Sequence, residues 1–200
     1  MNSLVFPGQG SQYVGMGKDL FDSFPEVKVI FEEVNDTLDL NLSRIIFDGP
    51  DDELILTENA QPAIMTIGIA IIEILKSRGF SVDKISNISA GHSLGEYTSL
   101  TALNSLSLTD TAKLLKLRGK AMQNSFPNGK GAMAAILGLN IDEVRETINS
   151  SEIKKICQIA NDNAPGQIVI SGEISAVNDI INILKEKGVK KAIKLPVSAP

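Results

Sequence analysis

A five-residue segment, Gly91-His92-Ser93-Leu94-Gly95, lies between a predicted short strand over residues 85–89 and a predicted helix over 96–103. A Gly-x-Ser-x-Gly pattern in this context is typical of a nucleophile elbow, in which small glycines permit a sharp turn. The serine hydroxyl is then exposed at a helix N-terminus, where the N–H of Leu94 can stabilise an oxyanion. The segment predicts an α/β fold with Ser93 as a candidate nucleophile. The alternative is a glycine-rich helix cap with Ser93 as the N-cap.

A second glycine-rich loop, Pro7-Gly8-Gln9-Gly10-Ser11-Gln12, follows a short apolar strand over residues 3–6. In an open α/β sheet, the loops at the carboxyl ends of the strands line the site. The backbone N–H of Gln9 is therefore a candidate second oxyanion donor. A phosphate-binding glycine loop, or a simple tight turn, would explain the same residues.

Longer helices are predicted in the first part of the chain, over residues 19–38, 59–78 and 109–124. Asn59 is expected to cap the second of these and Thr109 the third, and Pro62 fits the first turn of the second. Apolar residues cover most of the circumference of that second helix, so we expect it to be buried. Its longest apolar stretch, residues 63–75, is too short to span a bilayer, and we expect no membrane interaction.

The pattern changes after a turn at residues 127–131. From there the apolar spacing predicts a strand, a helix, two strands, a helix and a strand, over residues 132–139, 141–149, 156–160, 167–171, 175–187 and 190–197. By residue type alone, Asn161 belongs to the turn between the second and third strands. This βαββαβ order is typical of the ferredoxin-like arrangement. We therefore expect two domains, over residues 1–126 and 127–198.

Composition excludes several classes of function. The chain has 19 Lys and Arg against 24 Asp and Glu, and this net charge of -5 argues against nucleic-acid binding, which needs a basic face. Cys157 is the only cysteine and His92 the only histidine, so neither an internal disulfide nor a multi-cysteine or His-rich metal site is possible. The first residues lack a basic segment and a long apolar run, which predicts a cytoplasmic protein without a signal peptide. We expect a monomer.

Six segments, in order along the chain, carry a resemblance to a known family. They are Phe6-Pro7-Gly8-Gln9-Gly10-Ser11-Gln12 with Gly15-Met16-Gly17, Ala90-Gly91-His92-Ser93-Leu94-Gly95-Glu96-Tyr97, Arg118-Gly119-Lys120-Ala121-Met122-Gln123, Gly131-Ala132-Met133-Ala134-Ala135-Ile136, Asn161-Asp162-Asn163-Ala164-Pro165-Gly166-Gln167 and Leu195-Pro196-Val197-Ser198. Together they resemble the malonyl-CoA:acyl carrier protein transacylases and related acyltransferase domains. The resemblance implies an α/β-hydrolase-like large subdomain, whose C-terminal return is absent from this chain, and an inserted ferredoxin-like small subdomain.

The resemblance also implies a role for each matching residue. Ser93 would be the nucleophile, and the backbone N–H groups of Gln9 and Leu94 would form the oxyanion hole. The guanidinium of Arg118 would bind the malonyl carboxylate bidentately and so select malonyl over acetyl groups. Further substrate-binding residues would be His92, Met122 and Asn161. Without the resemblance, Arg118 belongs to a solvated helix face together with Lys113, Lys116 and Lys120.

The implied reaction is a two-step transfer in fatty acid biosynthesis. Ser93 attacks the thioester of malonyl-CoA, a malonyl-serine ester forms, and CoA leaves. The phosphopantetheine thiol of acyl carrier protein then takes the malonyl group. No metal or redox cofactor is needed, and the expected partners are malonyl-CoA and acyl carrier protein.

The serine needs a general base, and the resemblance implies a histidine just after residues 195–198. This sequence ends at Pro200, before that point. His92 directly precedes Ser93, and adjacent side chains at a sharp turn point apart, so we expect His92 to pack against the site wall. Two alternatives stay open. One is a non-catalytic, truncated fragment that lacks its base, and the other is a serine esterase, in which Arg118 would be dispensable.

Overall fold

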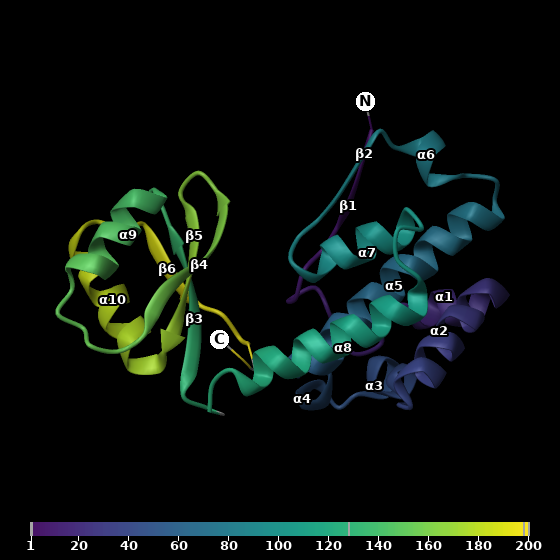
Figure 1. Cartoon of the computed structure of the whole chain (residues 1–200), viewed down its shortest axis with the longest axis horizontal. Helices are drawn as coiled ribbons and strands as arrows, with labels where there is room; N and C mark the ends of the chain where they lie inside the picture. The colour runs from purple at the N-terminus through teal and green to yellow at the C-terminus, as the bar shows by residue number, and fades with distance from the viewer. Residues whose placement is uncertain (1, 128, 198, 200) are drawn as a thin grey trace. The chain divides into compact units, whose positions relative to one another are not determined.

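The computed structural model describes residues 2–127, 129–197 and 199 (Figure 1), so Ser198, the last residue of the predicted second domain, lies outside the described residues. The chain forms two compact units, Met1–Ala121 and Met122–Pro200. They divide within helix α8 (Leu108–Asn124), and not after residue 126 as the sequence suggests. The reason is that the last buried residue of α8 is Gly119, so the helix stops packing on the first unit before it ends.

The first unit contains a short parallel sheet. Strands β1 (Ser3–Phe6) and β2 (Ile88–Gly91) pair so that Phe6 lies opposite Gly91. Both strands therefore end at the same edge, where the two glycine-rich loops begin. β2 starts later than predicted because helix α6 (Val82–Ile85) precedes it and the Ser86 hydroxyl accepts a hydrogen bond from the N–H of Ile88 at 3.3 Å.

Helices make up most of the first unit. They are α1 (Lys18–Ser23), α2 (Pro25–Leu38), α3 (Leu42–Asp48), α4 (Asp51–Leu54), α5 (Thr57–Ser77), α6, α7 (Leu94–Ala102) and α8. The prediction of one helix over residues 19–38 is wrong. The chain is extended at Phe24 because Pro25 lacks an N–H and disfavours a helical residue before it. Helix α5 packs against α2, α3, α4 and α7 and so forms the centre of this unit.

Helix α5 is buried, as the sequence predicts, but it begins earlier than expected and its N-cap is Leu56. The predicted cap, Asn59, lies inside the first turn, where its side chain donates a hydrogen bond to the carbonyl oxygen of Glu53 at 2.9 Å. Among the described helices, α5 alone is long and apolar enough to cross a membrane by length and composition. Its most apolar 18-residue stretch is 56% buried inside the protein, which fits the core helix of a folded unit.

The second unit is a four-stranded antiparallel sheet with two helices. Its elements are β3 (Gly131–Leu137), α9 (Ile141–Ser150), β4 (Cys157–Ala164), β5 (Gln167–Glu173), α10 (Ile174–Glu186) and β6 (Lys191–Lys194). The strand order is β4-β5-β3-β6, and buried residues of the sheet and of both helices form one apolar core. β4 continues to Ala164, so Asn161 lies in a strand opposite Val169 and not in a turn. The hairpin turn needs only two residues, Pro165 and Gly166, so Asn161 is part of the paired strand.

Cys157 begins β4 and is buried in the core of the second unit. Burial raises the pKa of its thiol to about 11, because a thiolate would lose its hydration there. The thiol therefore stays protonated near neutral pH, and its role is that of a small apolar residue.

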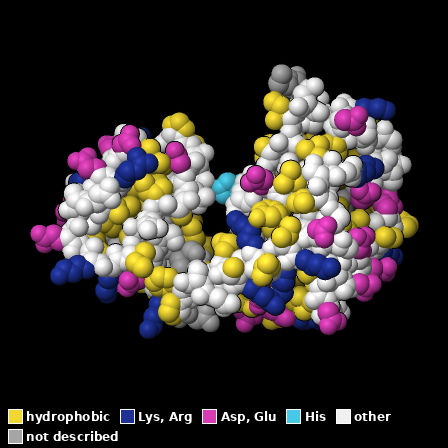
Figure 2. Space-filling model, viewed as in Figure 1, with side chains coloured by type: hydrophobic (Ala, Val, Ile, Leu, Met, Phe, Trp, Pro, Cys, Tyr) yellow, Lys and Arg dark blue, Asp and Glu magenta, His cyan; other side chains and the backbone are white. Residues whose placement is uncertain are grey.

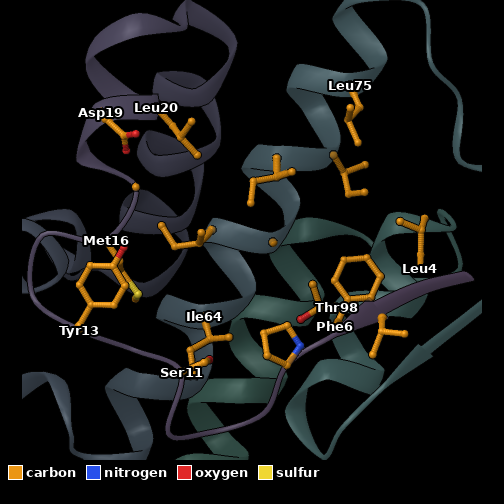
Figure 3. Close-up of a pocket in the computed structure, with 17 residues that line it drawn as sticks. Leu4, Phe6, Ser11, Tyr13, Met16, Asp19, Leu20, Ile64, Leu75 and Thr98 are labelled. Atoms are coloured by element: carbon orange, nitrogen blue, oxygen red, sulfur yellow. The ribbon is translucent and has the colours of Figure 1, made fainter.

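A cavity of about 470 Å³ lies beside β1 in the first unit (Figure 3). Its walls are mainly apolar and come from β1, the segment before α1 and one face of α5, including Phe6, Met16, Ile64 and Leu75. Thr98 also lines it, with a buried hydroxyl oxygen that has no hydrogen-bond partner among the described residues. Ser93 is not part of this cavity, so the cavity and the elbow are separate features.

Candidate active site

The segment between β2 and α7 makes a sharp turn at Ser93. Ser93 has φ 55° and ψ -112°, a left-handed conformation that is rare for a residue with a side chain. Two glycines make the turn possible. A Cβ on Gly91 would overlap the backbone of Gly95, and a Cβ on Gly95 would lie 2.8 Å from the carbonyl oxygen of Pro7. Strand, helix and first loop therefore meet at a distance that only glycine allows.

The Ser93 hydroxyl is exposed at the N-terminus of α7. Ser93 is the N-cap residue of α7 by position, but its side chain makes no capping hydrogen bond to the helix. Its oxygen instead accepts a hydrogen bond from Nη2 of Arg118 at 2.9 Å. The left-handed backbone explains the difference, since an N-cap side chain bonds back to the helix from an extended backbone. The hydroxyl is thus presented outward, as a nucleophile must be.

The loop after β1 lies directly against this turn. The N–H of His92 donates to the carbonyl oxygen of Phe6 at 3.0 Å, and the backbone at Gly8 touches the His92 ring. In the described part of the chain, neither the N–H of Gln9 nor that of Leu94 donates to a protein acceptor. Two backbone N–H groups therefore remain available near the ends of the paired strands. That of Gln9 lies in the loop after β1, and that of Leu94 directly follows the nucleophile. Such donors can stabilise an oxyanion.

Arg118 is half-buried, and its guanidinium is held at both ends. Nη1 donates to Oε1 of Gln61 at 2.6 Å, while Nη2 reaches Ser93. The guanidinium also lies 5.8 Å from the ring centroid of Tyr97, a cation–π distance. Without the family resemblance, the sequence assigns Arg118 and three lysines to a solvated face of this helix. Of these residues, only Lys113 and Lys120 are exposed. Figure 2 shows Lys and Arg side chains over the region of α8.

The charge of Arg118 is not neutralised within the described residues, because no carboxylate forms an ion pair with it. Its neighbour on α8, Lys116, differs in this respect. Lys116 Nζ lies 3.5 Å from a carboxylate oxygen of Glu58 and 2.8 Å from Oδ1 of Asn59. A cationic fork without a protein anion, next to a serine hydroxyl, is suited to a substrate that carries a carboxylate.

The close approach of α8 to α5 puts Arg118 in place. A Cβ on Gly119 would lie 2.7 Å from the backbone nitrogen of Glu58 and 2.7 Å from the carbonyl oxygen of Thr57. Helix α8 begins at Leu108, and Ser107 caps it by accepting from the N–H of Asp110 at 3.0 Å; the predicted cap, Thr109, lies inside the helix. Gly119 is therefore the point at which the two helices touch.

We expect Gly119→Ala to displace α8 and weaken the contact between Arg118 and Gln61. Alanine favours a helix over glycine by about 1 kcal/mol, but every atom that the new Cβ would overlap belongs to the α5 backbone and cannot move aside. That overlap costs about 3 kcal/mol, so the variant should be less stable. Thermal melting measures this, with Lys120→Ala on the exposed face as the matched control. A Gly119→Ala variant that melts at the wild-type temperature would contradict the close packing.

The structure brings Gln9, His92, Ser93, Leu94 and Arg118 together in the first unit. His92 is exposed, and its ring lies against Gly8. The other two candidates belong to the second unit: Met122 follows Arg118 by one turn of α8, and Asn161 lies in β4. Among the residues that the structure describes, no cluster of His, Cys, Asp or Glu could hold a metal ion.

Sequence reasoning missed the polar start of α5. Thr57 Oγ1 accepts from Nε2 of Gln9 at 3.2 Å, Asn59 holds Lys116, and Gln61 holds Arg118. All three polar residues are buried. Polar residues in the first turns of an otherwise apolar, buried helix were the available signal, because buried polar groups need partners.

Comparison with known proteins identifies the family. Residues 3–198 match the model of the acyl transferase domain. The chain belongs to the acyl transferase domain family. This acyl transferase domain is 45% identical over 199 residues to the malonyl CoA-acyl carrier protein transacylase of Bacillus subtilis, a match that covers 99% of this chain and 62% of that protein.

Solved structures resemble this acyl transferase domain along its whole length. The crystal structure of acyl-carrier-protein-S-malonyltransferase from Bartonella henselae has a TM-score of 0.93 and 50% identity, and covers 100% of this chain and 64% of its own. A malonyl-transacylase in complex with a type II PKS acyl-carrier protein has a TM-score of 0.91 and 38% identity, with coverage of 99% and 63%. The fold is therefore α/β, and the chain spans a little under two thirds of the length of these relatives.

Proposed function

We propose that this acyl transferase domain is part of a malonyl-CoA:acyl carrier protein transacylase of fatty acid biosynthesis. The observation that supports this most is the pairing of Ser93 with Arg118, a cation without a protein carboxylate, at 2.9 Å. A thioester that carries a free carboxylate offers a carbonyl for the serine and an anion for the arginine. Malonyl-CoA is such a thioester, and acetyl-CoA is not.

In the proposed first step, the Ser93 hydroxyl loses its proton and its oxygen attacks the thioester carbonyl of malonyl-CoA. The negative oxygen of the tetrahedral intermediate is stabilised by the N–H groups of Gln9 and Leu94. The carbon–sulfur bond then breaks, CoA leaves as its thiol after taking up a proton, and a malonyl ester of Ser93 remains.

In the proposed second step, the phosphopantetheine thiol of acyl carrier protein attacks the malonyl-serine ester. The bond from carbon to the serine oxygen breaks, and Ser93 regains its proton. His92 is exposed and packed on Gly8, and we assign the proton transfers to the histidine that the resemblance places after residues 195–198. The chemistry requires no metal or redox cofactor, and we place it in the cytoplasm, in a monomeric enzyme.

The two units fit the proposed enzyme. We assign Met1–Ala121 to the α/β-hydrolase-like large subdomain, because its parallel strands and elbow follow that plan. We assign Met122–Pro200 to the inserted ferredoxin-like subdomain, because its strand order is the one that a split βαβ unit produces. The C-terminal return to the large subdomain corresponds to part of the remaining length of the relatives.

Two other functions make different predictions. A serine esterase would use water as acceptor and would leave Arg118 without a role, whereas the guanidinium touches the nucleophile. A non-catalytic fragment would bind CoA or carrier protein without forming an acyl-serine adduct. Loading of the protein with a malonyl group, and its dependence on Arg118, separate the three.

We expect Arg118→Ala to lower kcat/KM for malonyl-CoA by roughly 10²-fold, because a charge-assisted pair with the substrate carboxylate is lost. The malonyl-to-acetyl preference should fall by a similar factor. The measurement is transfer to acyl carrier protein by the whole protein that carries this chain, with malonyl-CoA and acetyl-CoA in parallel. Arg145→Ala is the matched control, since Arg145 forms a surface ion pair with Asp142 on α9, in the other unit from Ser93. Retained malonyl preference in Arg118→Ala would count against the transacylase and favour the esterase.

A further inference from the structure

Gln61 is a fully buried polar residue in the first turns of α5, with 0% of its surface exposed. Its Oε1 accepts a hydrogen bond of 2.6 Å from Nη1 of Arg118. A guanidinium has only donors, so the amide must turn its oxygen, and not its nitrogen, toward Arg118. The contact therefore fixes the orientation of both groups.

We propose that Gln61 is a positioning residue that sets which acyl groups the site accepts. Gln61 holds Nη1 of Arg118, so Nη2 is the nitrogen that faces the acyl group. The site then selects an acyl group whose carboxylate is one carbon away from the thioester carbonyl. This rests on the proposed function, and it goes further by assigning the selection of chain length to a residue that does not touch the substrate.

The distances favour a short dicarboxylate. With Nη1 held, Nη2 lies 2.9 Å from the Ser93 oxygen, close to where the ester would form. In a malonyl ester, a single methylene separates the ester carbonyl from the carboxylate, so the carboxylate lies near that oxygen. A succinyl ester places its carboxylate one bond further away. The guanidinium cannot move to reach the more distant succinyl carboxylate. Its partner Gln61 is buried, and α8 is in close contact with α5 at Gly119.

The neutral amide is also the appropriate acceptor. A glutamate at this position would hold the guanidinium equally well, but it would neutralise the charge that Arg118 offers to a substrate. An apolar side chain of similar size would leave the charge intact and release Nη1. Of these three kinds of side chain, glutamine is the one that combines a fixed guanidinium with an available positive charge.

The test compares Gln61→Met and Gln61→Glu with wild type, in the whole protein that carries this chain. Malonyl-CoA, succinyl-CoA and acetyl-CoA are the donors, and kcat and KM are measured separately. We expect Gln61→Met to raise KM for malonyl-CoA by about tenfold and to lower the malonyl-to-succinyl ratio by a similar factor. Gln61→Glu should raise KM for malonyl-CoA and lower the malonyl-to-acetyl ratio, since the substrate carboxylate then competes with a buried one.

Thr66→Val is the matched control, because Thr66 is a buried polar residue of the same helix whose hydroxyl, among the described residues, bonds only to the carbonyl of Pro62. It should leave both substrate ratios at the wild-type value. A Gln61→Met protein with unchanged ratios would overturn the positioning role while leaving the transacylase intact. If Gln61→Met does not fold, unchanged ratios in Gln61→Ala, which also removes the acceptor oxygen for Nη1, have the same meaning. A wild-type protein that takes no malonyl group would overturn the proposed function, and the role of Gln61 with it.

Discussion

Replacing Ser93 with alanine is expected to abolish acyl loading and to lower malonyl transfer by a factor on the order of 10⁴ to 10⁶. No other hydroxyl takes its place, because the oxyanion donors and Arg118 converge on this position. The fold should be retained, since alanine can occupy the same turn and Ser93 makes no capping bond to α7. Intact-mass measurement after exposure of the whole protein to malonyl-CoA shows whether the adduct forms.

Ser105→Ala is the matched control for that experiment, because Ser105 is an exposed serine of the same unit away from the site. It should load as wild type does. A Ser93→Ala protein that still acquires one malonyl group would mean that another residue is the nucleophile. Wild-type protein that never acquires one, although it folds, would favour the non-catalytic alternative.

The second large effect is expected for Gly91→Ala. A Cβ at this position would overlap the backbone of Gly95 and Glu96, and backbone atoms cannot move aside as the end of a side chain can. We expect a loss of roughly 3 kcal/mol or more in the free energy of unfolding. Acyl loading should be lost too, because the backbone on either side of Ser93 would have to shift and would disturb its contact with Arg118. Denaturant unfolding and intact mass measure the two effects.

Gly79→Ala is the control for Gly91→Ala. It shows how much stability is lost when alanine replaces a glycine without any steric overlap. Gly79 has φ 84°, but a Cβ added there would meet no atom within 4 Å, so the same substitution should cost only about 1–2 kcal/mol. Equal losses at the two positions would mean that the tight contact between β2 and α7 is not what Gly91 provides.

Local patterns predicted the parts of this fold that depend on neighbours in sequence. The turn at Ser93 and the order of elements after residue 131 follow from glycine spacing and apolar periodicity. The break at Pro25 had a local signal too, but the apolar residues on either side suggested one continuous helix. The shift of β2 had a weaker signal, because it depends on the Ser86 hydroxyl bonding across to the first strand.

Contacts between distant segments could not be predicted in this way. The bonds from Gln61 to Arg118 and from Asn59 to Lys116 join the start of α5 to a helix more than fifty residues later. They exist because Gly119 lets the two helices touch, and nothing near Gly119 in sequence indicates what it touches. From the sequence, the role of Arg118 followed only from the family resemblance, and the residue that holds it was not foreseen.

The left-handed backbone at Ser93 limits which nucleophiles this fold can use. Threonine carries the same hydroxyl, but its branched side chain is strongly disfavoured at positive φ. Cysteine has an unbranched side chain and fits the same backbone. Descendants of such a protein could therefore exchange oxygen for sulfur in one substitution, whereas the smaller chemical change, the addition of one methyl group, is closed to them. The backbone conformation at residue 93, more than the reactivity of the side chain, therefore limits which nucleophiles can replace the serine.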